Sequence, residues 1–181
     1  LASTREGEEK RLLDALPAWD GRLLVVVVPR HPRRFEEVAQ WCDSRRTQLS
    51  LPRGEDKVHL GDTMGEMAFY YGAADVAVIG GSLEPLGGQN LIEALSAGTP
   101  VVTGPHMFNF SDATALAIGA GAAVQAGDAR AAIDAALALL ADRAAREKMA
   151  EAGKRLVQSH RGATEKHLRA CLELLKERAP G

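Results

Sequence analysis

Aromatic residues are scarce in this chain, at 4% of its 181 positions. Proteins that bind single-stranded nucleic acid stack the bases on aromatic side chains, and aromatic platforms serve many sugar-binding surfaces in the same way. The formal net charge of -2 gives no general attraction for a nucleic-acid backbone. The composition therefore argues against both classes and predicts no nucleic-acid partner.

Cysteine and long apolar runs are also few. Cys42 and Cys171 lie far apart and match no metal-ligand spacing, which favours a reduced cytoplasmic protein. The longest uninterrupted apolar run, residues 23–28, is far too short to cross a bilayer, and no signal-peptide pattern is present. The chain begins at Leu1 without a Met, already inside a helical pattern, so we expect an excised domain.

Strand and helix patterns alternate along the whole chain. Strands are predicted at 23–28, 48–51, 57–60, 75–79, 101–102 and 122–124. Helices are predicted after capping boxes at 3–6 and 63–66, and at 34–46, 90–97, 110–119, 128–140 and from 143 almost to the end. This alternation predicts a single α/β domain over residues 1–181, a three-layer Rossmann-like fold with a parallel sheet of about five or six strands.

The stretch from 80 to 93 is the most informative part of the sequence. The apolar strand pattern at 76–79 is followed by two glycine pairs, and a helical pattern opens at Asn90. Backbone N–H groups at the positive end of a helix dipole bind phosphate. Glu93 follows one turn later, where its carboxylate would accept hydrogen bonds from ribose hydroxyls; alternatively it caps the backbone of Asn90.

Three other strand-end loops carry polar residues, and ligands bind at the carboxyl ends of strands in such sheets. In Pro29-Arg30-His31-Pro32 the two prolines fix the loop, although an exposed loop histidine is the alternative. In Gly61-Asp62-Thr63-Met64-Gly65-Glu66, helix capping by Thr63 and Glu66 competes with ligand contact. In Gly104-Pro105-His106, the histidine would face the same crevice.

Together these motifs resemble the C-terminal, donor-nucleotide domain of the 3-deoxy-D-manno-octulosonic acid (Kdo) transferases. The resemblance spans residues 2 to about 125 and rests on the following segments in the family's order: Ala2-Ser3-Thr4 with Gly7-Glu8-Glu9, Pro29-Arg30-His31-Pro32, Gly61-Asp62-Thr63-Met64-Gly65-Glu66, Ala74-Asp75-Val76, Gly80-Gly81-Ser82, Gly87-Gly88-Gln89-Asn90 with Glu93, and Gly104-Pro105-His106 with Asn109-Phe110. The combination is highly specific, although each piece alone is not.

The resemblance implies the C-terminal half of a GT-B glycosyltransferase, in which two Rossmann-like domains face one another across a cleft. It implies transfer of Kdo from CMP-Kdo to a lipid A precursor at the cytoplasmic face of the bacterial inner membrane, in lipopolysaccharide biosynthesis, with no metal or other cofactor. The acceptor-activating carboxylate and the membrane-docking surface would belong to an N-terminal domain that this sequence lacks. We therefore expect donor binding without turnover, and no catalytic residue in this chain.

By resemblance, His31, Gly87, Gly88 and Asn90 would hold the CMP phosphate, Glu93 would hold the ribose, and Ser3 and Thr4 would line the cleft. The chain departs from the family pattern at Arg5 and Gln89, where histidine is common; Gln89 keeps hydrogen-bonding capacity but cannot become a cation. The full set of candidate donor-binding residues is Ser3, Thr4, Arg30, His31, Gly61, Asp62, Thr63, Gly65, Glu66, Gly81, Ser82, Gly87, Gly88, Gln89, Asn90, Glu93 and His106.

Two other functions remain open from the sequence. A GT-B glycosyltransferase that uses a UDP-sugar would have the same fold and a similar glycine-to-Glu93 segment. A non-catalytic Rossmann-like module would bind no nucleotide at all. Nucleotide titration distinguishes the three.

Overall fold

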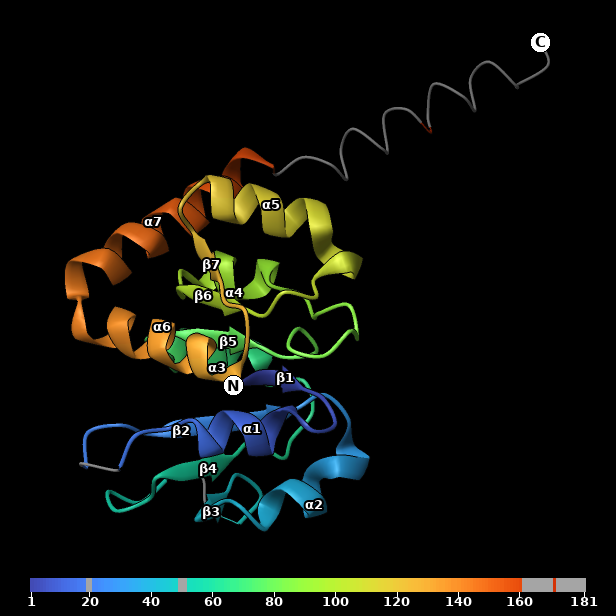
Figure 1. Ribbon diagram of the computed structural model, residues 1–181, viewed down its shortest axis with the longest axis vertical. Coiled ribbons are helices and arrows are strands. Elements are labelled where there is room, and N and C mark those ends of the chain that lie inside the picture. The colour runs from blue at the N-terminus through green and yellow to red at the C-terminus, as the bar shows by residue number, and fades with distance from the viewer. Residues whose placement is uncertain (19–20, 49–51, 161–170, 172–181) are drawn as a thin grey trace, which may run out of the picture.

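The computed structural model describes residues 1–18, 21–48, 52–160 and 171. Seven parallel strands form one sheet in the order β3-β4-β2-β1-β5-β6-β7 (Figure 1). The strands are β1 (Ala2–Thr4), β2 (Val25–Pro29), β3 (Ser44–Arg45), β4 (Val58–Leu60), β5 (Ala77–Ile79), β6 (Val101–Thr103) and β7 (Ala123–Gln125). The predicted α/β class and parallel sheet are confirmed, although the sheet is larger than the five or six strands expected.

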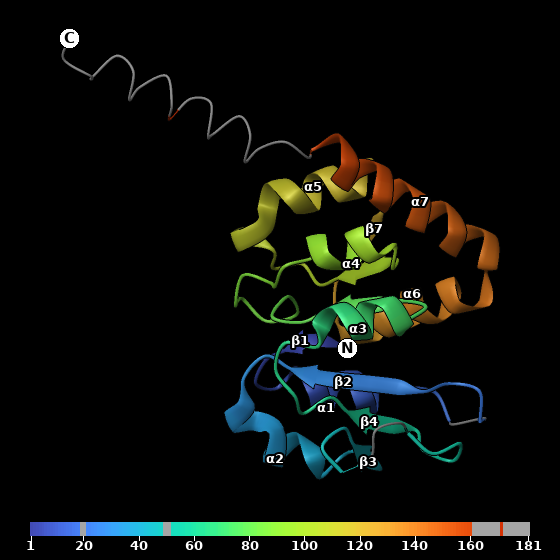
Figure 2. The ribbon, with the colours of Figure 1, turned by 180° about the vertical axis from the view of Figure 1, so that it is seen from behind.

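Helices cover both faces of this sheet. The helices α1 (Glu8–Asp14) and α6 (Ala129–Ala141) lie on one face, and α3 (Met67–Ala73) and α4 (Ile92–Ala97) lie on the other (Figures 1 and 2). The remaining helical elements are the 3₁₀ turns η1 (Pro32–Arg34) and η2 (Phe108–Phe110), and the helices α2 (Phe35–Ala39), α5 (Ser111–Gly119) and α7 (Arg143–Ser159). None of the helices in the described ranges is both long and apolar enough to cross a membrane.

The core follows from the alternation of side chains along each strand. In β5, Val78 packs with residues of α1 and α6, whereas Ala77 and Ile79 pack with residues of α3 and α4. Val102 and Val101 of β6 divide between the two faces in the same way. Successive residues of a strand point to opposite faces, so a sheet covered on both sides needs uninterrupted apolar strands.

The helix predicted to follow the Ser3–Glu6 capping box and to run to Leu16 is present as α1, but the capping box does not form. Ser3 and Thr4 instead belong to β1, which pairs with β2 on one side and β5 on the other. The helix starts only at Glu8, after Gly7 with a φ of 84°. A three-residue strand is too short to show a periodic pattern, and its pairing between β2 and β5 determines its conformation.

The predicted helix at 34–46 is also too long. In its place the structure has η1, the five-residue helix α2 and the short strand β3. The strand predicted at 48–51 falls mostly on residues 49–51, which lie outside the described residues. The C-terminal helical prediction holds for α7 up to Ser159. Asp128 caps α6 as predicted, because its side chain accepts a hydrogen bond from the Ala131 N–H.

Candidate functional site

The loops that follow four neighbouring strands are bonded to one another at the carboxyl edge of the sheet. The Arg30 N–H donates to the Thr4 carbonyl at 3.0 Å, and the His106 N–H donates to the Ser82 carbonyl at 2.9 Å. A Cβ at Gly80 would lie 2.5 Å from the Thr4 Cα, so glycine is required where the β1 and β5 ends meet. The structure thus brings the predicted residues after β1, β2, β5 and β6 together.

A buried carboxylate fills the anion-binding turn after β5. Glu8, whose side chain is 0% exposed, accepts hydrogen bonds from four backbone N–H groups. Their lengths are 2.6 Å from Gly81, 3.0 Å from Ser82, 2.9 Å from Leu83 and 2.9 Å from Arg5. Successive backbone N–H groups of this kind commonly bind an external anion. In this protein the carboxylate of Glu8 occupies these N–H groups.

The amides of Gly81 and Ser82, two of the candidate donor-binding residues, are therefore already bonded to the protein. The Ser82 hydroxyl is committed as well, since it donates to the Ile79 carbonyl at 2.5 Å and accepts from the Gly104 N–H at 2.7 Å. Ser82 is completely buried. These residues hold the β5 and β6 loops in place, and a donor phosphate has to bind elsewhere along the edge.

The second glycine pair shapes the loop where phosphate is expected. Gly87 and Gly88 have φ values of 90° and 77°, which fold the chain back so that the Gly88 N–H donates to the Gly81 carbonyl at 2.6 Å. The Gly88 amide, which was expected to face the phosphate, is therefore bonded within the loop. The backbone N–H groups of Gly87, Gln89 and Asn90 have no acceptor in the part of the chain that the structure describes.

The helix after this loop begins later than predicted. α4 starts at Ile92, whose N–H donates to Asn90 Oδ1 at 3.0 Å. Glu93 does not cap the Asn90 backbone; instead Asn90 Nδ2 donates to Glu93 Oε1 at 3.3 Å. Glu93 is exposed. Its carboxylate therefore stays accessible beside the open amides of Gln89 and Asn90.

Positive charge gathers next to these amides. Burial lowers the pKa of His31, and the nearby charges of Arg5, Arg33 and Arg30 lower it further, while Glu6 opposes them. His31 is half-buried, and Arg30 is exposed. Three guanidinium groups and one carboxylate, that of Glu6, act on this histidine, and the excess of positive charge is suited to receive an anionic ligand.

The loop after β4 belongs to a separate network. Asp62 accepts hydrogen bonds from the Thr47 N–H at 2.9 Å, from Thr47 Oγ1 at 2.6 Å and from Arg45 Nε at 2.6 Å. Burial opposes ionisation of Asp62, but these hydrogen bonds hold its pKa below the usual range. Glu66 pairs with Arg46 and accepts from Thr63.

These pairings correct two expectations for that loop. The carboxylates of Asp62 and Glu66 are held by protein donors, so we assign them to loop structure instead of donor contact. The capping box does not form, since α3 begins at Met67 with no side-chain cap. Gly61 is packed so closely that a Cβ would lie 2.8 Å from the Tyr70 ring. Thr63 and Gly65 remain at the loop surface.

Ser3 and Thr4 differ in their access to a ligand. Thr4 is fully buried, and its hydroxyl donates to Glu9 Oε1 at 2.9 Å. Glu9 in turn pairs with the buried Arg34 at 2.9 Å. Ser3 is half-buried and has a φ of 55°, which is unusual for a residue other than glycine.

Sequence reasoning missed Glu8 and Glu9, which organise the edge. Two adjacent acidic residues in a helical pattern usually lie on a solvated face. Here both are fully buried. A signal was present in the position of Glu8, one residue after a glycine and directly beyond a strand, but only the folded edge reveals its partners.

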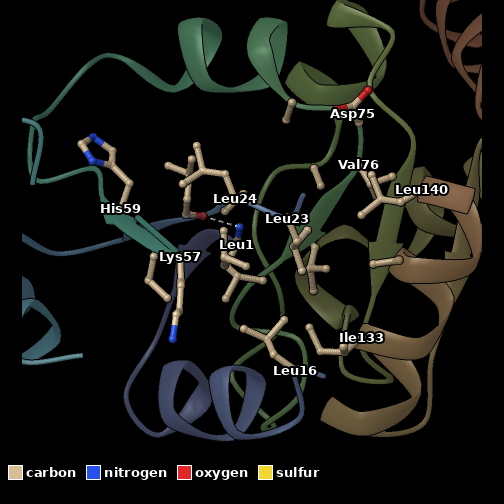
Figure 3. A pocket seen from close by; sticks show the side chains of 18 of the residues that line it. Leu1, Leu16, Leu23, Leu24, Lys57, His59, Asp75, Val76, Ile133 and Leu140 are labelled. Carbon is tan, nitrogen blue, oxygen red and sulfur yellow. Dashed lines mark hydrogen bonds between the residues drawn. The ribbon is translucent and has the colours of Figure 1, made fainter. Parts of the chain in front are cut away.

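The described structure also has a large cavity at the opposite, amino ends of the strands (Figure 3). Its volume is about 1230 Å³, and Figure 3 shows Leu1, Leu23, Leu24, Val76 and Leu140 around it. None of the predicted donor-binding residues lines it. In the described ranges no group of three or more His, Cys, Asp or Glu side chains is placed to hold a metal ion.

Comparisons with known proteins agree with this arrangement. A family model described as glycosyl transferases group 1 matches residues 48–156. The 3-deoxy-D-manno-octulosonic acid transferase of Bordetella pertussis is 51% identical over 97% of this chain and 44% of its own length. The enzyme of the same name from Haemophilus influenzae is 37% identical over 97% of this chain and 42% of its own length. The chain spans less than half the length of these two curated relatives.

One solved structure is matched over most of its own length. The C-terminal CMP-Kdo binding domain of WaaA from Acinetobacter baumannii is similar with a TM-score of 0.82 and 35% sequence identity. The match covers 87% of this chain and 86% of that domain. The likeness therefore extends over nearly all of a structural unit that was itself crystallised.

Proposed function

The chain belongs to the Kdo transferase family of group 1 glycosyltransferases and has the fold of its C-terminal domain, and from this premise we propose that it binds the CMP-Kdo donor. The whole enzyme would transfer Kdo to a lipid A precursor in lipopolysaccharide biosynthesis. The observation that carries the proposal is the set of open N–H groups at Gln89 and Asn90, beside the exposed carboxylate of Glu93.

The proposed binding mode divides the nucleotide between these groups. The N–H groups of Gln89 and Asn90 hold the phosphate, and His31 and Arg30 add hydrogen bonds or positive charge from the neighbouring loop. Glu93 accepts hydrogen bonds from the ribose hydroxyls. Ser3 and His106, both half-buried at the same edge, border the site.

The proposed contribution to catalysis is electrostatic. When the bond between the sugar and the phosphate breaks, negative charge grows on the departing CMP. Fixed N–H groups at 89 and 90 meet that charge without reorganising, so they bind the transition state more strongly than the ground state. The base that activates the acceptor hydroxyl would come from the rest of the enzyme, together with the surface that docks at the cytoplasmic face of the inner membrane.

The test is calorimetric titration of the chain with CMP. We expect Glu93→Gln to weaken CMP binding roughly tenfold or more, since hydrogen bonds to a charged acceptor are lost. Asp112→Asn is the matched control, because Asp112 is an exposed carboxylate in the first turn of α5. Equal effects of the two substitutions, or tighter binding of UDP than of CMP, would contradict the proposal.

The proposed donor binding needs no metal, because arginine side chains supply the positive charge and His31 supplies a hydrogen bond. Addition of EDTA should leave the CMP affinity unchanged in the same titration. A loss of affinity that Mg²⁺ restores would show that a metal ion takes part.

A further inference from the structure

The Arg5 side chain has an unusual position at the donor edge. The Arg5 N–H donates to Glu8 Oε2 at 2.9 Å, and the same oxygen accepts from the Gly81 N–H at 2.6 Å. One buried carboxylate oxygen therefore joins the end of β1 to the turn after β5. Arg5 is fixed through its backbone, which leaves the guanidinium available for another partner.

The side chain of Gln89 lies beside that of Arg5, next to Gly81. A Cβ at this position would lie 3.1 Å from Gln89 Nε2 and 3.4 Å from Arg5 Cγ. Because Gly81 has no side chain, both Arg5 and Gln89 pack directly over its Cα. Gln89 also carries one of the open backbone amides. The Arg5 stem therefore lies next to the proposed phosphate position.

The guanidinium of Arg5 is not satisfied by the protein. Its Nε is buried and has no hydrogen-bond partner among the described residues. The carboxylate oxygen paired with it, Glu6 Oε2, is 4.0 Å from Nε, too far for a hydrogen bond. By contrast, Arg33 donates to Glu6 at 3.0 Å. A buried donor without a partner is costly, and it needs an explanation such as a ligand.

The donor of the proposed function has a second anion that fits this description. In a CMP-linked ulosonic acid, the carbon that is bonded to the phosphate oxygen also bears the sugar's carboxylate. The two anions therefore sit side by side. An arginine binds a carboxylate through two parallel N–H groups, a geometry that lysine cannot reproduce.

We propose that Arg5, with Gln89 beside it over Gly81, binds the carboxylate of the donor sugar. This inference rests on the proposed function and extends it to selection of the sugar. The backbone amides at 89 and 90 hold the phosphate, whereas Arg5 distinguishes an acidic donor sugar from a neutral one.

The test compares two ligands of the chain by calorimetry. CMP-Kdo carries the carboxylate; the methyl ester of CMP has the same phosphodiester charge without it. We expect Arg5→Met to weaken CMP-Kdo binding about tenfold or more and to leave methyl ester binding nearly unchanged. Arg5→Lys should recover part of the loss through charge alone. Arg155→Met is the matched control, since Arg155 is an exposed arginine of α7 that pairs with Glu151.

A fold check and the pattern of affinities for the two ligands together decide whether Arg5 binds the sugar carboxylate. Arg5→Met keeps most of the apolar stem, and thermal unfolding of each variant checks that the fold persists. Equal weakening of both ligands, or no weakening of CMP-Kdo, would overturn the inference and leave the proposed function standing. Failure of the unsubstituted chain to bind either ligand would overturn both.

Discussion

At the scale of the residue, the charged groups around His31 set the pKa of its imidazole. Its pKa is lowered by burial and by the charges of Arg5, Arg33 and Arg30, with Glu6 acting in the opposite direction. The imidazole is therefore neutral at pH 7, and it would contact a phosphate as a hydrogen-bond donor. Because this pKa lies below the usual value of about 6.5, protonation requires a lower pH than for an ordinary histidine.

The predicted consequence is a pH-dependent contribution to binding. Anion binding favours the imidazolium, so protons and CMP bind cooperatively. The affinity of the unsubstituted chain, divided by that of His31→Gln, should rise as the pH falls from 7.5 to about 5.5. Dividing the affinities removes the ionisation of CMP itself. A ratio that stays constant over this range in calorimetric titrations would show that His31 does not contact the phosphate.

At the scale of the element, the turn after β5 depends on the first residue of α1. Glu8 replaces an external anion and fixes three successive amides of that turn. The six-residue helix α4 is short, so the loop conformation and its individual N–H groups matter more than a helix dipole. The sequence interpretation placed the phosphate at a helix end; the structure instead offers a loop just before one.

We predict that Glu8→Gln lowers the free energy of unfolding by about 3 kcal/mol or more, because the carboxamide faces N–H groups with its own NH₂. Glu55→Gln, at an exposed position, should change it by less than about 0.5 kcal/mol. Denaturant unfolding measures both. In Glu8→Ala, added formate should restore part of the stability by occupying the vacated site. Unchanged stability of Glu8→Gln would refute the role given to this carboxylate.

At the scale of the whole molecule, the proposed site is an open edge of the sheet. The chain covers 44% and 42% of the two relatives' lengths, and a GT-B cleft is completed by a second domain. The large cavity lies at the amino ends of the strands, away from the donor edge at their carboxyl ends. Donor binding and glycosyl transfer should therefore be separable activities.

We predict that the 181-residue chain binds CMP but transfers no Kdo to a lipid A precursor, because the acceptor-activating base is expected elsewhere in the enzyme. Incubation with CMP-Kdo and acceptor, followed by mass spectrometry of the lipid, tests this. The full-length Bordetella pertussis relative is the positive control. Product formed by the chain at a comparable rate would show that it carries its own base.

The sequence by itself determined the fold class and the edge where we propose that the donor binds. Uninterrupted apolar strands such as 25–28 require cover on both faces, and parallel strands place their following loops at one edge. Local patterns therefore sufficed for β2, β5 and α6, and the order of motifs identified the family. The position of Glu93 beside an open loop also followed from sequence spacing.

The tertiary structure alone decided which polar groups remain free. Glu8, Ser82 and Asp62 carry the residue types that bind ligands, yet in the fold their polar atoms are bonded to other parts of the protein. Their partners come from elements distant in the chain, and β1 owes its strand conformation to such long-range pairing. Hydrogen-bond satisfaction depends on three-dimensional neighbours, which no local pattern records.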